Sequence, residues 1–318
     1  MGNLSEQRLR KLWARQLPAK WGKAYEPSIQ VTPREAPKSS RPSLMWSNLL
    51  GRQMHVMSAS EQIVGILAQY AKNVFEIHEQ KILPTSPDYH PLSEFYLAAG
   101  IDVPSTSGTV AIADHLGCLR QHPVIYVDGQ AVPYNYLGDF LLFCRDEVGP
   151  FCVDISVKNT MESFKKRHGQ IIGIGKKTEK ENKKEANRHE IQEILNAELG
   201  IRMVYIAGSD FNKRLRYNMT HLYKLHARDV NIDDICRDYI VNELNQCLVA
   251  GIPPISIKED ICNEVGCGEY EFRMVFYQSI WRQDVSADLY SCIQIDVAMT
   301  PEKLNPIDDY AELFVRNI

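Results

Sequence analysis

The sequence predicts an α/β fold in which a mixed sheet flanked by helices is followed by a smaller C-terminal α+β domain. Two apolar runs with alternating polarity, residues 136–144 and 151–158, are separated by the polar, glycine-containing segment RDEVGP and predict a β-hairpin. Beyond residue 228 the pattern changes, and apolar residues recur at helical spacing over residues 232–248. A chain of 318 residues is long enough for two such cores.

The first 43 residues are predicted to form a basic arm and linker. Residues 1–52 hold ten Lys or Arg residues and three Glu residues, an excess of seven positive charges. Residues 26–43 are rich in Pro and Ser, which is typical of an extended linker. The arm either follows a DNA phosphate backbone or is a solvated tail, and charge alone does not separate these alternatives. The candidate DNA contacts are Arg34, Lys38, Arg41 and Arg52.

Residues 44–228 are predicted to form the main domain. A helix begins at Ser58, because Ser58 and Glu61 make a capping box ahead of apolar residues at helical spacing. Further elements are expected on both sides of the hairpin. They are strands over residues 74–83 and 202–207 and helices over residues 176–199 and 210–226, with no clear element in residues 84–133.

Residues 229–318 are predicted to form the C-terminal domain. After the helix over residues 232–248, helical spacing indicates a short helix from about Ser256 and another over residues 270–283. Residues 288–296 resemble a strand, so the order of elements is the outline of a winged-helix module. The region is acidic in places, whereas a winged helix that grips DNA usually carries a basic recognition helix. We therefore expect it to bind a protein partner.

Polar residues on the predicted hairpin point to catalytic chemistry. Period-two alternation places one set of side chains on a single face of the second strand: Cys152, Asp154, Ser156 and Lys158. The hairpin can bring Asp139, on the first strand, close to Lys158. Because lysine is almost never buried without a partner, a lysine in an apolar strand indicates a functional role.

A carboxylate and a lysine in this arrangement suit metal-dependent hydrolysis of a phosphodiester. Mg²⁺ prefers oxygen ligands, polarises a phosphate and lowers the pKa of its bound water. The ammonium of Lys158 would orient the attacking water and offset charge on the phosphoryl oxygens. The expected metal ligands are Glu61, Asp139 and the backbone carbonyl of Val157.

Each of these residues also has a structural interpretation. In that interpretation Glu61 is no more than the third residue of the capping box. Asp139 closes a turn or pairs with Lys158 in a structural salt bridge. Asp154 is expected mainly as the partner of a surface charge. The order of a Glu on a helix, an Asp on a strand and a Lys on the partner strand favours the catalytic interpretation.

The same residues stand in runs that can be compared with known families. The chain reads Ser58-Ala-Ser-Glu61, then Val74-Phe-Glu-Ile77-His-Glu79-Gln80-Lys-Ile-Leu83, and later Leu137-Gly-Asp139-Phe140 and Ile155-Ser156-Val157-Lys158. This pattern resembles TnsA, the DNA-cutting subunit of heteromeric bacterial transposons, over about residues 40–225. The resemblance implies a restriction-endonuclease-like core whose active site is Glu61, Asp139 and Lys158. Ser156 stands where such nucleases often have Glu or Gln.

The resemblance also implies an activity and partners. It implies an Mg²⁺-dependent endonuclease, with Mn²⁺ as a substitute in vitro, that cleaves the non-transferred 5′ strand at transposon ends. The implied partners are those DNA ends, an integrase-type transposase subunit (TnsB-like) and an AAA+ ATPase regulator (TnsC-like). The alternatives are a stand-alone restriction or repair endonuclease and a non-catalytic DNA-binding scaffold. The candidate accessory residues are Ser156, Asp154, Glu79 and Gln80.

The sequence gives no indication of a membrane or an oxidising compartment. No stretch approaches the roughly 20 apolar residues that span a bilayer, and the charged N-terminus does not resemble a secretory signal. The eight cysteines lack zinc-like spacing, so we expect free thiols in a cytoplasmic protein.

Overall fold

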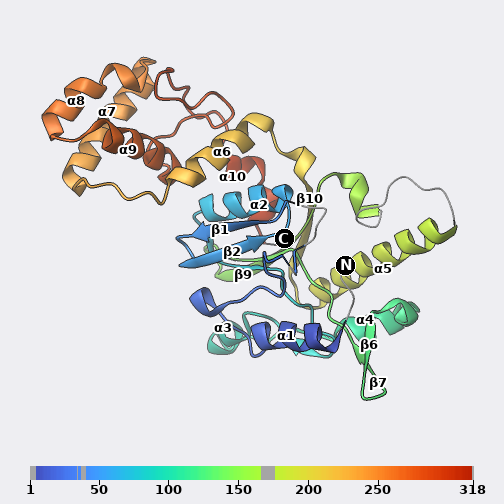
Figure 1. Ribbon diagram of the computed structural model, residues 1–318. Coiled ribbons are helices and arrows are strands. Elements are labelled where there is room, and N and C mark those ends of the chain that lie inside the picture. Colours follow the sequence, from blue (N-terminus) through green and yellow to red (C-terminus); the bar gives the residue numbers. More distant parts are fainter. Residues whose placement is uncertain (1–4, 34, 37–40, 166–175, 317–318) are drawn as a thin grey trace. The chain divides into compact units, whose positions relative to one another are not determined.

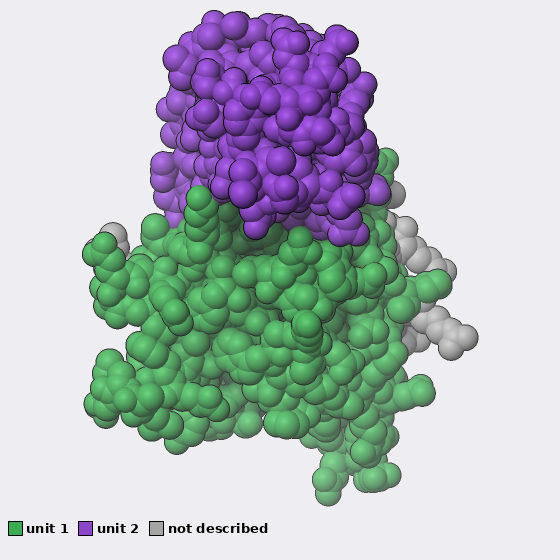
Figure 2. All heavy atoms as spheres, turned by 90° about the vertical axis from the view of Figure 1, so that its left-hand side faces the viewer, with its two compact units in different colours: residues 1–210, 312–318 green, residues 211–311 purple. Residues whose placement is uncertain are grey.

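The computed structural model describes residues 5–33, 35–36, 41–165 and 176–316 (Figure 1). It separates into two compact units, coloured in Figure 2. Unit 1 comprises Met1–Asp210 together with Glu312–Ile318, and unit 2 comprises Phe211–Ala311. The units divide at residue 210 and not at 228.

The core of unit 1 is a four-stranded mixed sheet with the order β10-β9-β8-β3. Strands β8 (Phe140–Arg145) and β9 (Pro150–Lys158) pair antiparallel, which confirms the predicted hairpin. Strand β3 (Val74–Glu79) pairs antiparallel with β8. Strand β10 (Arg202–Ala207) runs parallel to β9, and the chain passes between them through the long helix α5 (Lys176–Glu198). The mixed α/β class is therefore confirmed.

Both faces of this sheet are covered by helices. Helix α2 (Ala59–Tyr70) packs on one face, where Gly65 lies over the ring of Phe140. Helix α5 packs on the other face, where Ile191 and Leu195 join a buried cluster with Phe143. Since neither face meets solvent, the polar side chains of β9 up to Ser156 are buried as fully as its apolar ones.

Helix α2 begins as its capping sequence predicts. Ser58 has extended backbone geometry at the N-cap, and its hydroxyl accepts the Glu61 N–H at 3.1 Å. The helix then buries Ile63, Val64 and Leu67 against the sheet. The capping box thus fixes where the helix starts and brings Glu61 to the sheet end.

The N-terminal segment packs on unit 1 over its described residues. Helix α1 (Glu6–Gln16) buries Leu9 and Leu12 in a cluster with Ile125. Arg15 is buried and pairs with Glu35 at 2.7 Å, so this cation of the predicted arm is bound within the fold. A short 3-10 helix, Gly22–Ala24, follows.

Unit 1 also contains short strands and helices outside the main sheet. Several of them lie in residues 84–133, for which the sequence predicted no clear element. Strands β1 and β2 form a hairpin under α2, and β6 and β7 form another around an Asp128–Gly129 turn with positive φ at both residues. The bounds are β1 Ser43–Ser47, β2 Arg52–Val56, β4 Asp88–Tyr89, α3 Ser93–Ala98, β5 Ser105–Thr106, α4 Thr109–His115, β6 Val124–Val127 and β7 Gln130–Pro133; 3-10 turns span Leu119–Gln121, Met161–Lys165 and Gly208–Asp210.

Unit 2 is helical. Its helices are α6 (Lys213–Leu225), α7 (Asp234–Ala250), α8 (Lys258–Val265), α9 (Glu269–Arg282) and α10 (Pro306–Asp309), with 3-10 turns at Pro254–Ser256 and Ala311–Leu313 where unit 1 resumes. The predicted helices are confirmed, and α6 joins them because it packs on α9.

The predicted strand over residues 288–296 is wrong, and with it the winged-helix outline. The Asp288 carboxylate accepts the Tyr290 N–H at 3.0 Å and the Ser291 hydroxyl at 2.7 Å, which folds this segment into a turn. Leu289, Ile293 and Ile295 gave the apolar alternation, and they are buried from a loop. Within the described part of unit 2, β pairing is limited to the Ala287–Pro301 bridge.

The chain ends by returning to unit 1. The Phe314 carbonyl accepts Asn73 Nδ2 at 2.9 Å, and Arg316 pairs with Asp146 at 2.6 Å. All eight cysteines are free. Over the described ranges, no helix is both long and apolar enough to cross a bilayer.

Candidate active site

Asp139 is fixed at the end of the hairpin. It directly precedes β8, and its Oδ2 accepts the Val157 N–H at 2.7 Å and the Ser156 hydroxyl at 3.4 Å. No described residue donates to Asp139 Oδ1. The carboxylate is therefore tied to β9 beside Lys158, with one oxygen left for a ligand. The hairpin thus places Asp139 against Val157, the chain neighbour of Lys158, while the Lys158 ammonium pairs with Glu185.

Glu61 lies on the same end of the sheet and is held from three sides. Its Oε2 accepts the Met57 N–H at 2.8 Å and Gln80 Nε2 at 3.2 Å, while Oε1 accepts the Ser58 hydroxyl at 3.0 Å. The Glu61 side chain therefore reaches back to the Met57 N–H and the Ser58 hydroxyl, and not to the Ser58 N–H as in a standard capping box. Since a carboxylate has about four acceptor positions, these bonds do not exhaust its capacity to bind a cation.

The charges of the site act on one another. Burial, and next the negative charge of Asp139, raise the pKa of Glu61 to about 8. Lys158 acts in the opposite sense and lowers the pKa of Glu61. The three predicted catalytic residues are thus close enough to interact. Two neighbouring carboxylates, one of them buried, are an environment in which a cation is favourable.

The donor set fits a hard cation that keeps water ligands. Among the residues that the structure describes, no group of three or more His, Cys, Asp and Glu side chains is arranged to hold a metal ion. A metal ion at this site would have the carboxylates of Glu61 and Asp139 as side-chain ligands, with the other positions left to backbone oxygen and water. Mg²⁺ is commonly bound by one or two carboxylates in this way, so the residues fit it.

Lys158 has a partner that the sequence did not reveal. Lys158 is 15% exposed, and its Nζ lies 3.5 Å from Glu185 Oε1. Glu185 also pairs with Arg188 at 3.1 Å and His189 at 3.5 Å. Burial opposes ionisation of Glu185, but His189, Arg188 and Lys158 lower its pKa, so the carboxylate stays charged. In the sequence, Glu185 is hidden among the interleaved charges of α5.

Ser156 and Asp154 support the hairpin from the α5 side. Ser156 is buried and donates to Asp139, so its role is to position that carboxylate. Asp154 was expected at the surface, which is wrong. It is 3% exposed and accepts Gln192 Nε2 at 2.8 Å and Asn196 Nδ2 at 2.6 Å. Burial raises the pKa of Asp154 to about 6.

Gln80 touches both carboxylate residues. Its side chain donates to Glu61, and its backbone N–H donates to the Asp139 carbonyl at 2.9 Å. Its φ of 53° lies in the left-handed region, which few non-glycine residues adopt. From α1, Gln16 Nε2 donates to the Gln80 carbonyl at 3.0 Å, and Gln16 Oε1 accepts the Ile82 N–H at 2.9 Å. These two hydrogen bonds from Gln16 stabilise the left-handed backbone conformation at Gln80.

Glu79 and Arg52 form a separate structural pair. Arg52 donates to both oxygens of Glu79, at 2.7 and 2.9 Å, and the two side chains are 7% and 0% exposed. Arg52 was predicted to contact DNA, but its guanidinium is turned inward and satisfies Glu79. Arg41 is exposed, whereas Arg34 and Lys38 lie outside the described residues.

Comparison with known proteins adds no assignment. No family model matches the chain, and no curated protein matches it.

Proposed function

We propose that the chain is a metal-dependent DNA endonuclease that hydrolyses phosphodiester bonds with Glu61, Asp139 and Lys158. The observation that supports this best is the placement of Asp139, which accepts the Val157 N–H next to Lys158 and lies within electrostatic reach of the buried Glu61. A purely structural core would have little reason to bring two carboxylates together in a buried setting.

The side chains have separable roles in this proposal. Glu61 and Asp139 would hold the cation, and Gln80 and Ser156 orient these two carboxylates. Lys158 offsets the charge that develops on the phosphoryl oxygens, and Glu185 holds its ammonium in place before DNA arrives. A bound Mg²⁺ would supply a polarised phosphate and a water of lowered pKa.

The biological setting that we propose follows the resemblance to TnsA. In that setting the chain is one subunit of a heteromeric transposase and cleaves the 5′ strand at transposon ends. It would act with an integrase-type transposase subunit and an AAA+ regulator. The capping bonds of Glu61 are the observation that favours the alternative, a non-catalytic scaffold.

The test is Mg²⁺-dependent cleavage of an end-containing duplex, with and without a co-purified transposase subunit. We expect Asp139→Ala and Lys158→Ala each to lower the strand-cleavage rate at least about 100-fold, because each removes a group that acts on transition-state charge. The exposed variant Asp102→Ala serves as the control and should retain the wild-type rate. Wild-type cleavage by either site variant would exclude the assignment. Specific cleavage by the chain alone would favour a stand-alone endonuclease.

A further inference from the structure

Helix α6 of unit 2 has one buried face and one cationic face. At about 100° per residue, Lys213, Tyr217 and Lys224 fall within about 40° of one another around the helix. Arg214 and His221 border them on the same side. Lys213, Arg214, Tyr217 and Lys224 are exposed, and His221 is half-buried. Leu215, Met219 and Leu222 on the opposite face are buried, and the helix packs on α9. We call the first face the α6 surface: Lys213, Arg214, Tyr217, His221 and Lys224.

The positive charge of unit 2 is concentrated on and next to this helix. Residues 211–228 contain five Lys or Arg residues and no Asp or Glu. Residues 229–311 contain five Lys or Arg residues against sixteen Asp or Glu residues. The charge distribution of unit 2 is therefore strongly polarised along the chain.

The cations of the α6 surface are also not neutralised within the fold. No carboxylate of the described residues lies within ion-pair distance of Lys213, Arg214 or Lys224. Elsewhere in unit 2, Lys258 and Arg273 both pair with Glu269, at 2.9 and 3.7 Å. Exposed cations without internal partners are free to bind an external anion.

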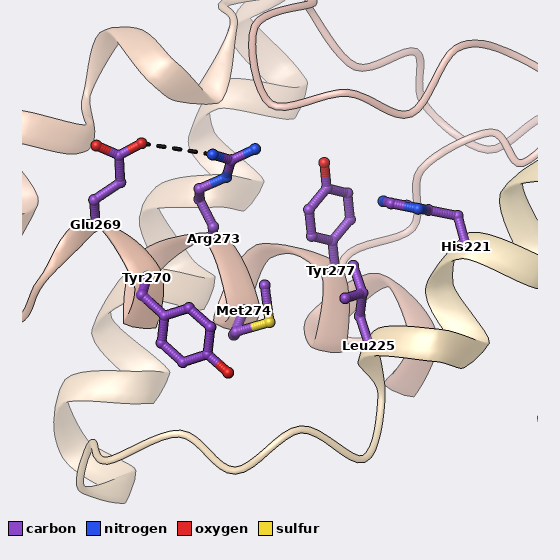
Figure 3. Close-up of a pocket in the computed structure, with 7 residues that line it drawn as sticks. All are labelled: His221, Leu225, Glu269, Tyr270, Arg273, Met274 and Tyr277. Atoms are coloured by element: carbon purple, nitrogen blue, oxygen red, sulfur yellow. Dashed lines mark ion pairs between the residues drawn. The ribbon is translucent and has the colours of Figure 1, made fainter.

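An aromatic groove continues the α6 surface toward α9 (Figure 3). Its volume is about 510 Å³. The His221 ring meets Tyr277 edge-on with centroids 4.8 Å apart, and it lies parallel to Tyr217, with centroids 6.4 Å apart. The groove is lined by His221, Leu225, Glu269, Tyr270, Arg273, Met274 and Tyr277.

We propose that the α6 surface binds the sugar-phosphate backbone of DNA. Unpaired lysines and arginines attract phosphates and release their counterions, while Tyr217 and the groove rings pack on sugars or stack on bases. The acidic composition of residues 229–318 favoured a protein partner, but the basic helix α6 lies outside that range. The choice of DNA as the anion rests on the proposed function, whereas the surface itself is independent of the catalytic residues.

The test is binding of the full-length chain to a fluorescent DNA duplex of about 30 base pairs in EDTA, so that catalysis plays no part. Lys213→Ala combined with Lys224→Ala should weaken binding at least about tenfold at low salt. It should also reduce the slope of log K against log salt by about two, because each phosphate contact contributes about 0.9. Tyr217→Ala should weaken binding by a smaller factor with the slope unchanged.

The matched control replaces two exposed cations outside the α6 surface, Arg282→Ala with Lys303→Ala, and should leave affinity and slope as in the wild type. Circular dichroism and thermal unfolding verify that each variant is folded. Wild-type affinity and slope in the α6 variant would overturn the proposal. The proposal would also be overturned if the α6 variant lost binding to an acidic polyglutamate probe but kept its binding to DNA. That result would make an acidic protein the partner of the α6 surface. Loss of DNA binding in the α6 variant, with no Mg²⁺-dependent cleavage by the wild type, would support the surface and refute the endonuclease.

Discussion

Two buried glutamates near the end of β3 have opposite surroundings. Glu79 is fully buried, and Arg52 donates to both of its oxygens. Glu61 is 6% exposed, and the charge that raises its pKa is another carboxylate, Asp139. Burial raises the pKa of both groups, but Arg52 opposes the shift at Glu79, whereas Asp139 adds to it at Glu61. The sign of the neighbouring charge therefore separates a glutamate that stabilises the fold from one suited to bind a cation.

The largest effect on stability is expected at the buried ion pair of Arg52 and Glu79. Arg52→Ala leaves Glu79 buried without its cation and should lower the free energy of unfolding by about 3–5 kcal/mol. Urea denaturation measures this change. Replacing both partners, Arg52→Leu with Glu79→Leu, should recover most of the loss, because no buried charge remains. A loss below about 1 kcal/mol in the single variant would mean that the pair contributes little.

The second prediction concerns how stability and Mg²⁺ affinity depend on pH through Glu61, whose neighbour Asp139 is another carboxylate. The pKa of Glu61 is raised to about 8 from its usual 4.5, so the folded, metal-free protein holds this proton more tightly than the unfolded chain. Its contribution to stability is fully present below pH 4.5 and is lost as the pH rises through about 8. Cation binding needs the ionised form, so Mg²⁺ affinity should rise about tenfold per unit between about pH 5 and pH 7.

Calorimetric titration with Mg²⁺ at several pH values measures this dependence. Asp139→Asn should move the pH dependence of stability to lower values, since it removes the charge that adds to the shift at Glu61. Glu61→Gln should remove that part of the dependence altogether. The same pH dependence of stability in the wild type and in Glu61→Gln would contradict the expectation.

The smallest effect is expected at Gln80, which orients Glu61. Gln80→Asn keeps a residue type that tolerates left-handed backbone but is too short to reach the carboxylate. We expect Mg²⁺ affinity to fall about threefold to tenfold, the value of one hydrogen bond of roughly 1 kcal/mol, with little change in stability. Gln80→Gly relieves the backbone and should lower the affinity to a similar extent. Unchanged affinity in both variants would restrict Gln80 to a structural role.

The hairpin and the contact of Asp139 with β9 were predictable because they depend on local rules. Alternation, a glycine-containing turn and a capping box are encoded within a few residues. Lys158 also stood out, since a lysine in an apolar strand violates the local pattern. These features required no knowledge of distant parts of the chain.

The errors came from contacts across long sequence separations. Arg52 looked like a free surface cation because Glu79, its partner, lies 27 residues away. Asp154 looked exposed because its amide donors are on α5, and Glu185 looked solvated because the helix around it is highly charged. The alternation in residues 288–296 predicted a strand, but the side chain of Asp288 favours a turn.

The return of the chain to unit 1 after residue 311 makes unit 2 an insertion. The first and last residues of unit 2 lie together: the rings of Phe211 and Tyr310 have centroids 4.9 Å apart, and the Tyr310 hydroxyl accepts the Asn212 N–H at 3.3 Å. An insertion whose entry and exit are neighbours can be gained, lost or exchanged without disturbing the host fold. The four-stranded mixed sheet and the helical unit are therefore separable modules, each open to change independently of the other.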